Sequence, residues 1–181
     1  MSRWGIWLAA LLLSFAPSAR AAVVLTFYSH AMGGSFPHAF IGLHGTRDAD
    51  RRPIDNNYGF TAVSVTPALL AGSVRGMVED TAGSYVRHSQ AHFSVVLGDA
   101  ELANVLAAVQ RWRDAPQNSY NLDRANCIHF VADVARTLGM EAEVTRNLRR
   151  RPQAFLDWLQ RRNTTWLAAR SHVGTAITAV R

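Results

Sequence analysis

The sequence has one cysteine, Cys127, among 181 residues, so no intramolecular disulfide can form. It also lacks an apolar run of the roughly 20 residues that a membrane-spanning helix needs. Its 12 glycines and 6 prolines show no collagen period. What is present is a chain with 49% hydrophobic and 18% charged residues and a formal net charge of +6. This composition is typical of a single globular domain and excludes a disordered or fibrous chain.

The first 21 residues have the pattern of a secretory signal peptide. Arg3 is followed by an apolar stretch from Trp4 to Ala16 and by small residues that end at Ala21. At about 1.5 Å per residue the apolar stretch covers about 20 Å of a hydrocarbon core of about 30 Å, which is too short for a permanent anchor. We therefore expect cleavage after Ala21 and a secreted or periplasmic protein with no transmembrane span. The remaining chain should comprise a domain over residues 22–163 and a tail over residues 164–181 with no predicted structure.

The remaining pattern predicts an α+β fold, in which a small antiparallel sheet packs against helices. Alternating apolar and β-branched residues predict strands, and Asp99, Asn126 and Pro152 are typical of helix starts. A loop is expected over residues 45–56. The expected strands cover residues 22–28, 38–43, 58–65, 74–79 and 93–97, and the expected helices begin at Asp99 (as N-cap), at Cys127 (ending near Gly139) and at Pro152.

Cys127 is the candidate nucleophile. It follows the capping residue Asn126 at a predicted helix start, where unpaired N–H groups and the positive end of the helix dipole favour a thiolate. It shares a helix face with Val131, Val134 and Leu138, so its sulfur should point toward the sheet.

A cysteine nucleophile needs a base within hydrogen-bond reach, and His38 is the prediction because it opens the strand His38–Leu43. His30, which ends the preceding strand, is the main rival. His129 should point away from the sulfur, and His44 lies about 20 Å along the strand from His38.

The third catalytic residue should accept a hydrogen bond from the second ring nitrogen of the base. We predict Asn57, on the neighbouring strand, and keep Tyr58 and Thr61 open because the hairpin register is not fixed by the sequence. The Cys127 N–H, with the side chain of Asn121 or Tyr120, could form an oxyanion site.

The strand His38-Ala-Phe-Ile-Gly-Leu43 and the helix start Asn126-Cys127-Ile-His-Phe130, preceded by Tyr120-Asn-Leu, resemble the circularly permuted papain-like thiol hydrolases. This superfamily joins NlpC-type cell-wall peptidases to lecithin:retinol acyltransferase-like enzymes, and the segment 57–60 is similar to one in uncharacterised secreted bacterial proteins. The resemblance covers residues 23–140. It implies a papain-like core, with Cys127 as nucleophile and His38 as base, that cleaves an amide, peptide or ester bond through a thioester. The sequence departs from the family at the third position, where no histidine follows on the paired strand.

The implied substrate is a peptide or acyl compound from the cell wall or a lipid, with no cofactor, metal or nucleic acid. The arginines at 146, 149, 150 and 151 predict either a solvated loop and helix start or contact with an anionic surface. Two other functions compete. His88 and His92, with His30, His38 and His44, could bind a metal. Alternatively, the fold could bind a ligand without catalysis, with Cys127 buried and unreactive.

Overall fold

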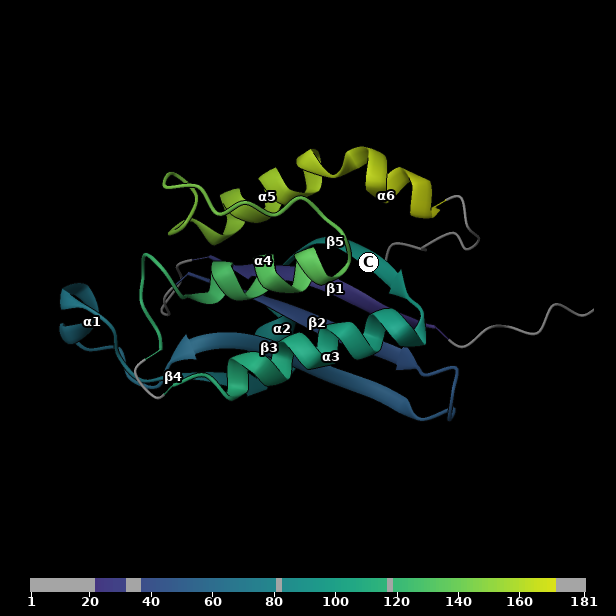
Figure 1. The fold of residues 1–181 in the computed structure, drawn as a ribbon, viewed down its shortest axis with the longest axis horizontal. Helices are drawn as coiled ribbons and strands as arrows, with labels where there is room; N and C mark the ends of the chain where they lie inside the picture. Colours follow the sequence, from purple (N-terminus) through teal and green to yellow (C-terminus); the bar gives the residue numbers. More distant parts are fainter. Residues whose placement is uncertain (1–21, 32–36, 81–82, 117–118, 172–181) are drawn as a thin grey trace, which may run out of the picture.

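The computed structural model describes residues 22–31, 37–80, 83–116 and 119–171. The predicted signal peptide and His172 lie outside these residues. The described chain is an α+β protein with one five-stranded antiparallel sheet and flanking helices (Figure 1). The order of elements is β1 (Val23–His30), β2 (His38–Thr46), β3 (Pro53–Ala62), α1 (Ala68–Ala71), β4 (Gly76–Asp80), α2 (Gly83–Arg87), β5 (Gln90–Leu97), α3 (Asp99–Arg113), α4 (Cys127–Thr137), α5 (Pro152–Arg162) and α6 (Thr164–Ser171).

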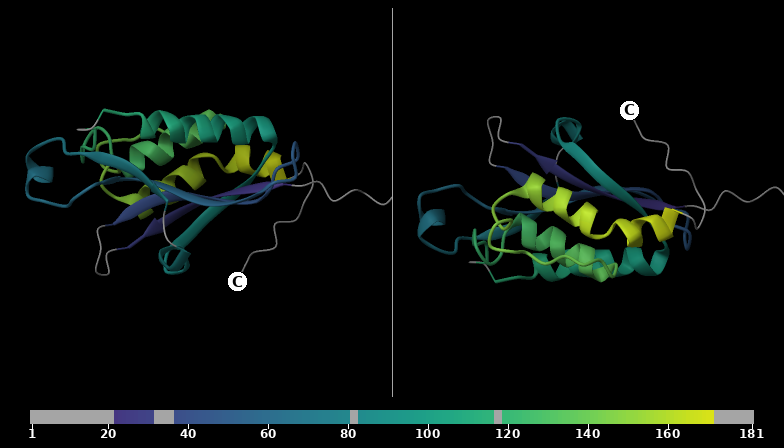
Figure 2. Two further views of the ribbon diagram at one scale, coloured as in Figure 1. Left: turned by 90° about the horizontal axis from the view of Figure 1, so that it is seen from below. Right: turned by 90° about the horizontal axis from the view of Figure 1, so that it is seen from above.

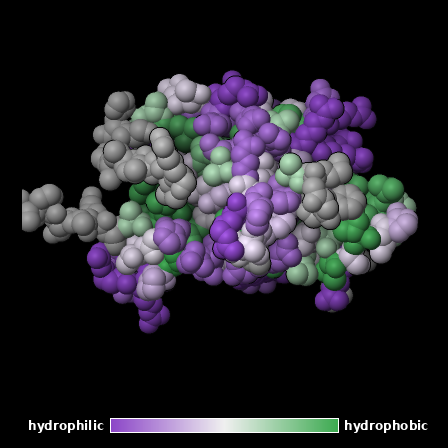
Figure 3. All heavy atoms as spheres, turned by 180° about the vertical axis from the view of Figure 1, so that it is seen from behind, coloured by the Kyte–Doolittle hydropathy of each residue, from purple (hydrophilic) through white to green (hydrophobic). Residues whose placement is uncertain are grey.

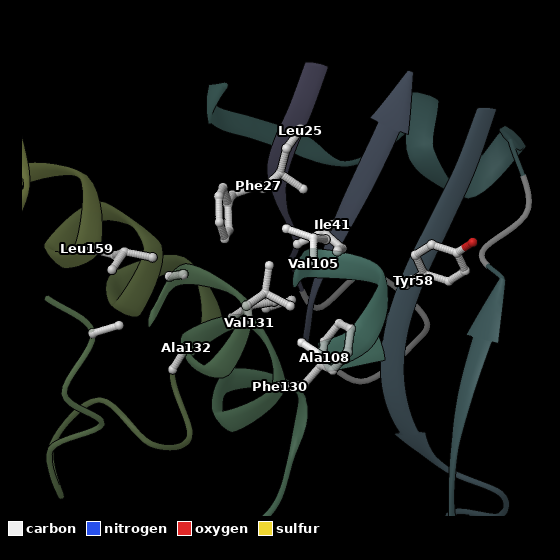
Figure 4. Close-up of a cluster of buried hydrophobic side chains, with 14 of the residues drawn as sticks. Leu25, Phe27, Ile41, Tyr58, Val105, Ala108, Phe130, Val131, Ala132 and Leu159 are labelled. Atoms are coloured by element: carbon white, nitrogen blue, oxygen red, sulfur yellow. The ribbon is translucent and has the colours of Figure 1, made fainter. Parts of the chain in front are cut away.

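The strands lie in the order β4-β3-β2-β1-β5, and every neighbouring pair is antiparallel. Helices α3 to α6 lie on one side of this sheet and the short α2 lies on the other (Figure 2). Side chains alternate between the two faces of a strand, so one face of β1 and β2 packs on the long helices. Phe27 and Ile41 belong to that face and meet Val105 of α3 and Val131 of α4 in the core (Figure 4).

Helix α4 is the central helix of the core. Apolar residues occupy most of its circumference, and all but four of its eleven residues are buried. Gly139 follows the helix with φ of 82°, a conformation that glycine adopts without strain, and so ends it. The predicted start, inward face and stop of this helix are confirmed.

Other boundaries differ from the predictions. The expected loop at 45–56 is partly strand, because β2 runs to Thr46 and β3 starts at Pro53. Helix α3 has Gly98, not Asp99, as its N-cap, because Glu101 accepts a hydrogen bond from the Gly98 N–H at 3.1 Å. The tail contains α6, and the segment 63–65 is not a strand. None of the helices in the described part of the chain is long and apolar enough to cross a bilayer.

Candidate functional site

Asn126 fixes the start of α4. Its side-chain oxygen accepts hydrogen bonds from the backbone N–H groups of Ile128 at 2.9 Å and His129 at 3.3 Å. Its amide nitrogen donates to the carbonyls of Leu122 and Arg149, both at 2.7 Å. The side chain is buried and uses both its donors, so the backbone around Cys127 is held from two sides. The cap takes the second and third N–H groups of the helix and leaves that of Cys127 to other acceptors, its own sulfur among them.

His129 completes this cap and does not face the thiol. Its Nδ1 lies 2.9 Å from the Asn126 side-chain oxygen, which can only accept, so Nδ1 carries the proton. Burial, with Arg136 and Arg149 nearby, lowers the pKa of His129. The ring is therefore a neutral structural donor.

The Cys127 side chain packs between α4 and the start of β2 and is only 4% exposed. Burial raises its pKa to about 11, although backbone hydrogen bonds from Ala39, Ile128 and Cys127 itself act in the opposite direction. The contribution of Ala39 places the sulfur beside the residue that directly follows His38. The resting group is a neutral thiol at neutral pH.

Cys127 and His38 both border one cavity of about 860 Å³, a size typical of small-molecule sites. The cavity lies where α4 begins, between the β3–β4 hairpin and the segment that leads into α5. Its wall combines apolar side chains with a few polar and charged groups. The lining residues include His38, Thr61, Glu79, Tyr85, Tyr120, Cys127, Leu69, Val65, Arg149 and Arg150.

His38 reaches this cavity from the α2 side of the sheet. It stacks with Phe40, whereas Ala39 and Ile41 between and beyond them belong to the core beneath the helices. Its Nε2 is buried without a hydrogen-bond partner and lies against the backbone of Gly59, where an added Cβ would fall within 2.4 Å of it. Burial first, and His30 second, lower the pKa of His38 to about 4. The imidazole is thus neutral, with an unused ring nitrogen.

The rival base, His30, is the neighbour of His38 across the β1–β2 ladder. Its Nδ1 lies 3.2 Å from the Ser89 hydroxyl, and its ring stacks on Tyr85 at 4.2 Å between centroids. It is not among the residues that line the cavity.

The three candidates for the third catalytic residue are separated by the strand register. The β2–β3 ladder ends at Ile41 and Tyr58, and Asn57 is paired with Gly42. Asn57 lines a second cavity of about 540 Å³, so the structure does not bring it to the cavity that His38 borders. Tyr58 faces the helices, with the Arg113 guanidinium 5.0 Å from its ring centre. Thr61 alone of the three lines the first cavity with His38.

Tyr120 and Asn121 were both candidates for the oxyanion site, and only Tyr120 lines the cavity. Burial raises the pKa of its hydroxyl, and Cys127 raises it further, so it stays a hydrogen-bond donor at neutral pH. The amide of Asn121 donates to the Ser73 hydroxyl at 3.2 Å.

Glu79 and Tyr85 are cavity residues that the sequence analysis did not identify. Burial raises the pKa of Glu79. Nothing in the local pattern marks either residue, because β4 and α2 are short and their positions depend on tertiary pairing.

Two of the four arginines singled out from the sequence, Arg149 and Arg150, line the cavity. Both form ion pairs with Asp123, at 2.9 and 2.6 Å. Arg146 and Arg151 are exposed.

Apolar side chains are exposed beside the cavity. Leu69 and Val65 line it, while Leu70 is 81% exposed and Val65 56% exposed. They belong to α1 and the segment before it, which protrude at one end of the protein (Figure 1) and form a hydrophobic end in the view from behind (Figure 3). This end combines apolar and basic groups around the cavity mouth.

The histidines at 88 and 92 do not converge. His88 Nδ1 lies 2.7 Å from the Ser84 carbonyl, and His92 is hydrogen-bonded to Ser29 and Asp157. Within the described ranges there is no group of three or more His, Cys, Asp or Glu side chains that could hold a metal ion.

Comparison with protein-family models, curated proteins and solved structures gives no match to this chain. The fold and the site define an α+β protein with a thiol and a neutral imidazole at one cavity.

Proposed function

We propose that this protein is a cysteine-dependent hydrolase or acyltransferase that cleaves an amide, peptide or ester bond at the cavity bordered by Cys127 and His38. One observation carries the proposal. A thiol at the start of a helix and a buried imidazole nitrogen with no partner border the same cavity. A buried, unsatisfied polar atom is costly, and such atoms are found where a ligand or a reaction uses them.

The neutral state of both groups sets the mechanism. With the thiol pKa near 11 and the imidazole pKa near 4, the resting pair is not an ion pair. His38 instead takes the thiol proton as the sulfur attacks the carbonyl carbon. This step requires the His38 side chain to move from its place against Gly59, on the α2 side of the sheet, to the sulfur on the helix side. The S–C bond forms, the bond to the leaving group breaks, and the proton passes to the leaving group. Water or another acceptor then cleaves the thioester.

The developing negative charge on the carbonyl oxygen needs donors. The Cys127 N–H is left unclaimed by the Asn126 side chain, and the Tyr120 hydroxyl lines the same cavity. The Asn126 cap fixes the backbone at Cys127 and the Tyr120 ring packs against Phe60, so both donors are positioned before the reaction, as such stabilisation requires. Thr61 replaces Asn57 as the candidate orienting residue in this proposal, because it alone of the three candidates borders the same cavity as His38.

The resemblance to permuted papain-like enzymes supports the same class, and an apolar mouth with Arg149 and Arg150 suits a peptide or acyl substrate that carries negative charge. We propose that the protein acts after export, with residues 1–21 removed as a signal peptide. Amino-terminal sequencing of the exported protein should then begin at Ala22.

A non-catalytic binding protein of the same fold is the second candidate. The high pKa of Cys127 favours it, because an inert buried thiol has the same property.

Incubation with p-nitrophenyl esters of short and long acyl chains, followed by intact-mass detection of an acyl-enzyme, distinguishes the two candidates. Catalysis predicts an adduct on Cys127 that is absent in Cys127→Ala and strongly reduced in His38→Asn. The matched control is His30→Asn, which removes the neighbouring imidazole and should retain the adduct. Peptide mapping of the folded wild-type protein decides the outcome: if esters are turned over and no acyl group is found on Cys127, the mechanism is rejected.

A further inference from the structure

A line of three hydrogen-bonded side chains, Ser29, His92 and Asp157, lies outside the cavity that Cys127 borders. The Ser29 hydroxyl is 2.7 Å from Nε2 of His92, and Nδ1 of His92 is 2.9 Å from a carboxylate oxygen of Asp157. The three residues come from β1, β5 and α5. None of them lines the cavity that contains Cys127.

A β-bulge places His92 in this line. Phe27 is paired with Phe93, and the next residue, Tyr28, is paired with Ala91, so His92 is the extra residue on β5. In a regular strand His92 would face away from Phe93, which stacks on Phe27 beneath the helices. The bulge turns His92 onto this helix-covered face, which Ser29 shares. Bulges often direct a side chain in this way beside functional sites.

The proton positions follow from the partners. An ionised carboxylate can only accept, so Nδ1 of His92 donates to Asp157 and Nε2 is left to accept the Ser29 O–H. Burial lowers the pKa of His92, and the Asp157 charge offsets only part of this decrease. The ring is therefore neutral at neutral pH. This is the order of nucleophile, base and orienting carboxylate found in serine hydrolases.

We propose that Ser29 is a second nucleophile, activated by His92 and Asp157, that takes an acyl group from small activated esters. The Ser29 proton passes to His92 Nε2 as the Oγ–C bond forms, and it then passes to the leaving alcohol as the ester C–O bond breaks. A water molecule, deprotonated by the same nitrogen, hydrolyses the acyl-serine and restores the hydroxyl.

The burial of these side chains limits which reagents can enter the site. Ser29 is 2% exposed and the His92 side chain 1%, whereas the Asp157 side chain is 39% exposed. Gln90, paired with Ser29 across β1 and β5, is bridged to Gln153 by a 3.1 Å hydrogen bond. Gln153 lies one helical turn before Asp157, so this exposed bridge joins β5 to α5 beside the serine. Only a small reagent should enter.

The test uses a small fluorophosphonate on the full protein carrying Cys127→Ala, so that the outcome is independent of the thiol site. Attack forms an Oγ–P bond and expels fluoride. Intact mass and peptide mapping should show one adduct, on Ser29. Asp157→Asn, which disturbs the ring's tautomer, should slow labelling by about 100-fold or more, and His92→Gln should do at least the same.

Ser94→Ala is the matched control. It removes the 2.8 Å Thr26–Ser94 hydrogen bond between the same two strands but outside the line, and labelling should stay within about two-fold. Gln153→Ala should speed labelling by opening the bridge. Absence of a Ser29 adduct on the folded protein, even with Gln153→Ala, overturns the proposal. An adduct that forms equally fast in Asp157→Asn also overturns it, and this variant decides the matter if His92→Gln does not fold.

Discussion

Replacing Asn126 with Ala removes five hydrogen bonds at the start of α4. Loss of an N-cap alone typically costs about 1 kcal/mol. The carbonyls of Leu122 and Arg149 also lose their side-chain donor, and a buried polar group left without a partner costs about 1–3 kcal/mol. Because water can enter the enlarged space and satisfy one of these carbonyls, we expect a total loss of about 3 kcal/mol in the free energy of unfolding.

For a domain of this size, about 3 kcal/mol corresponds to a fall in Tm of about 6–12 °C. Urea unfolding followed by circular dichroism measures the free energy, and calorimetry measures the Tm. Asn104→Ala, at an exposed position in α3, is the control and should change the free energy by less than about 0.5 kcal/mol. If Asn126→Ala were as mild as this control, the view that the cap organises the thiol site would be refuted.

Three further predictions concern the same site. The folded pKa of His38 lies below 6.5, so the unfolded chain binds a proton first as the pH falls. The free energy of unfolding should therefore be at its full value above pH 6.5 and drop by about 3 kcal/mol toward pH 4. In urea titrations His38→Asn should lose less stability over this acid range. The folded pKa of Cys127 lies above 9, so the free energy of unfolding should be at its full value below pH 9 and fall by about 3 kcal/mol toward pH 11. Cys127→Ala should lack this alkaline decline. An equal decline in both proteins would contradict the burial of the thiol. Gly59→Ala should destabilise by about 1–3 kcal/mol because its Cβ meets the His38 ring and Phe40, whereas Gly72→Ala meets nothing and should be neutral in thermal melts.

The helices were predictable where local signals agree. Asn126, the apolar spacing after it and Gly139 act within one stretch of chain, so α4 could be placed from its sequence. By contrast, the first residues of β3 are polar and charged because that end of the strand is half exposed, and they therefore resemble a loop. The short helices α1 and α2 contain too few residues to show a period.

The site divides in the same way. A thiol beside a helix cap is a local feature, and Cys127 does line a cavity together with His38. The position of Asn57 depends on the register of a hairpin, and the pairing of Asn57 with Gly42 is set by the whole ladder rather than by residues nearby. The line through His92 depends on a single extra residue in a strand, which alternation of residue types does not reveal.

The hydrogen bond from Asn126 to the Arg149 carbonyl connects the cap of α4 to a residue of the cavity wall. The same residue whose carbonyl holds the cap also lines the cavity, and its guanidinium is paired with Asp123. An anionic ligand that drew this guanidinium away from Asp123 would pull on the carbonyl that steadies the helix start. Anion binding at the cavity rim and proton binding by the Cys127 thiol would then be thermodynamically linked, and each would alter the affinity of the other by the same factor.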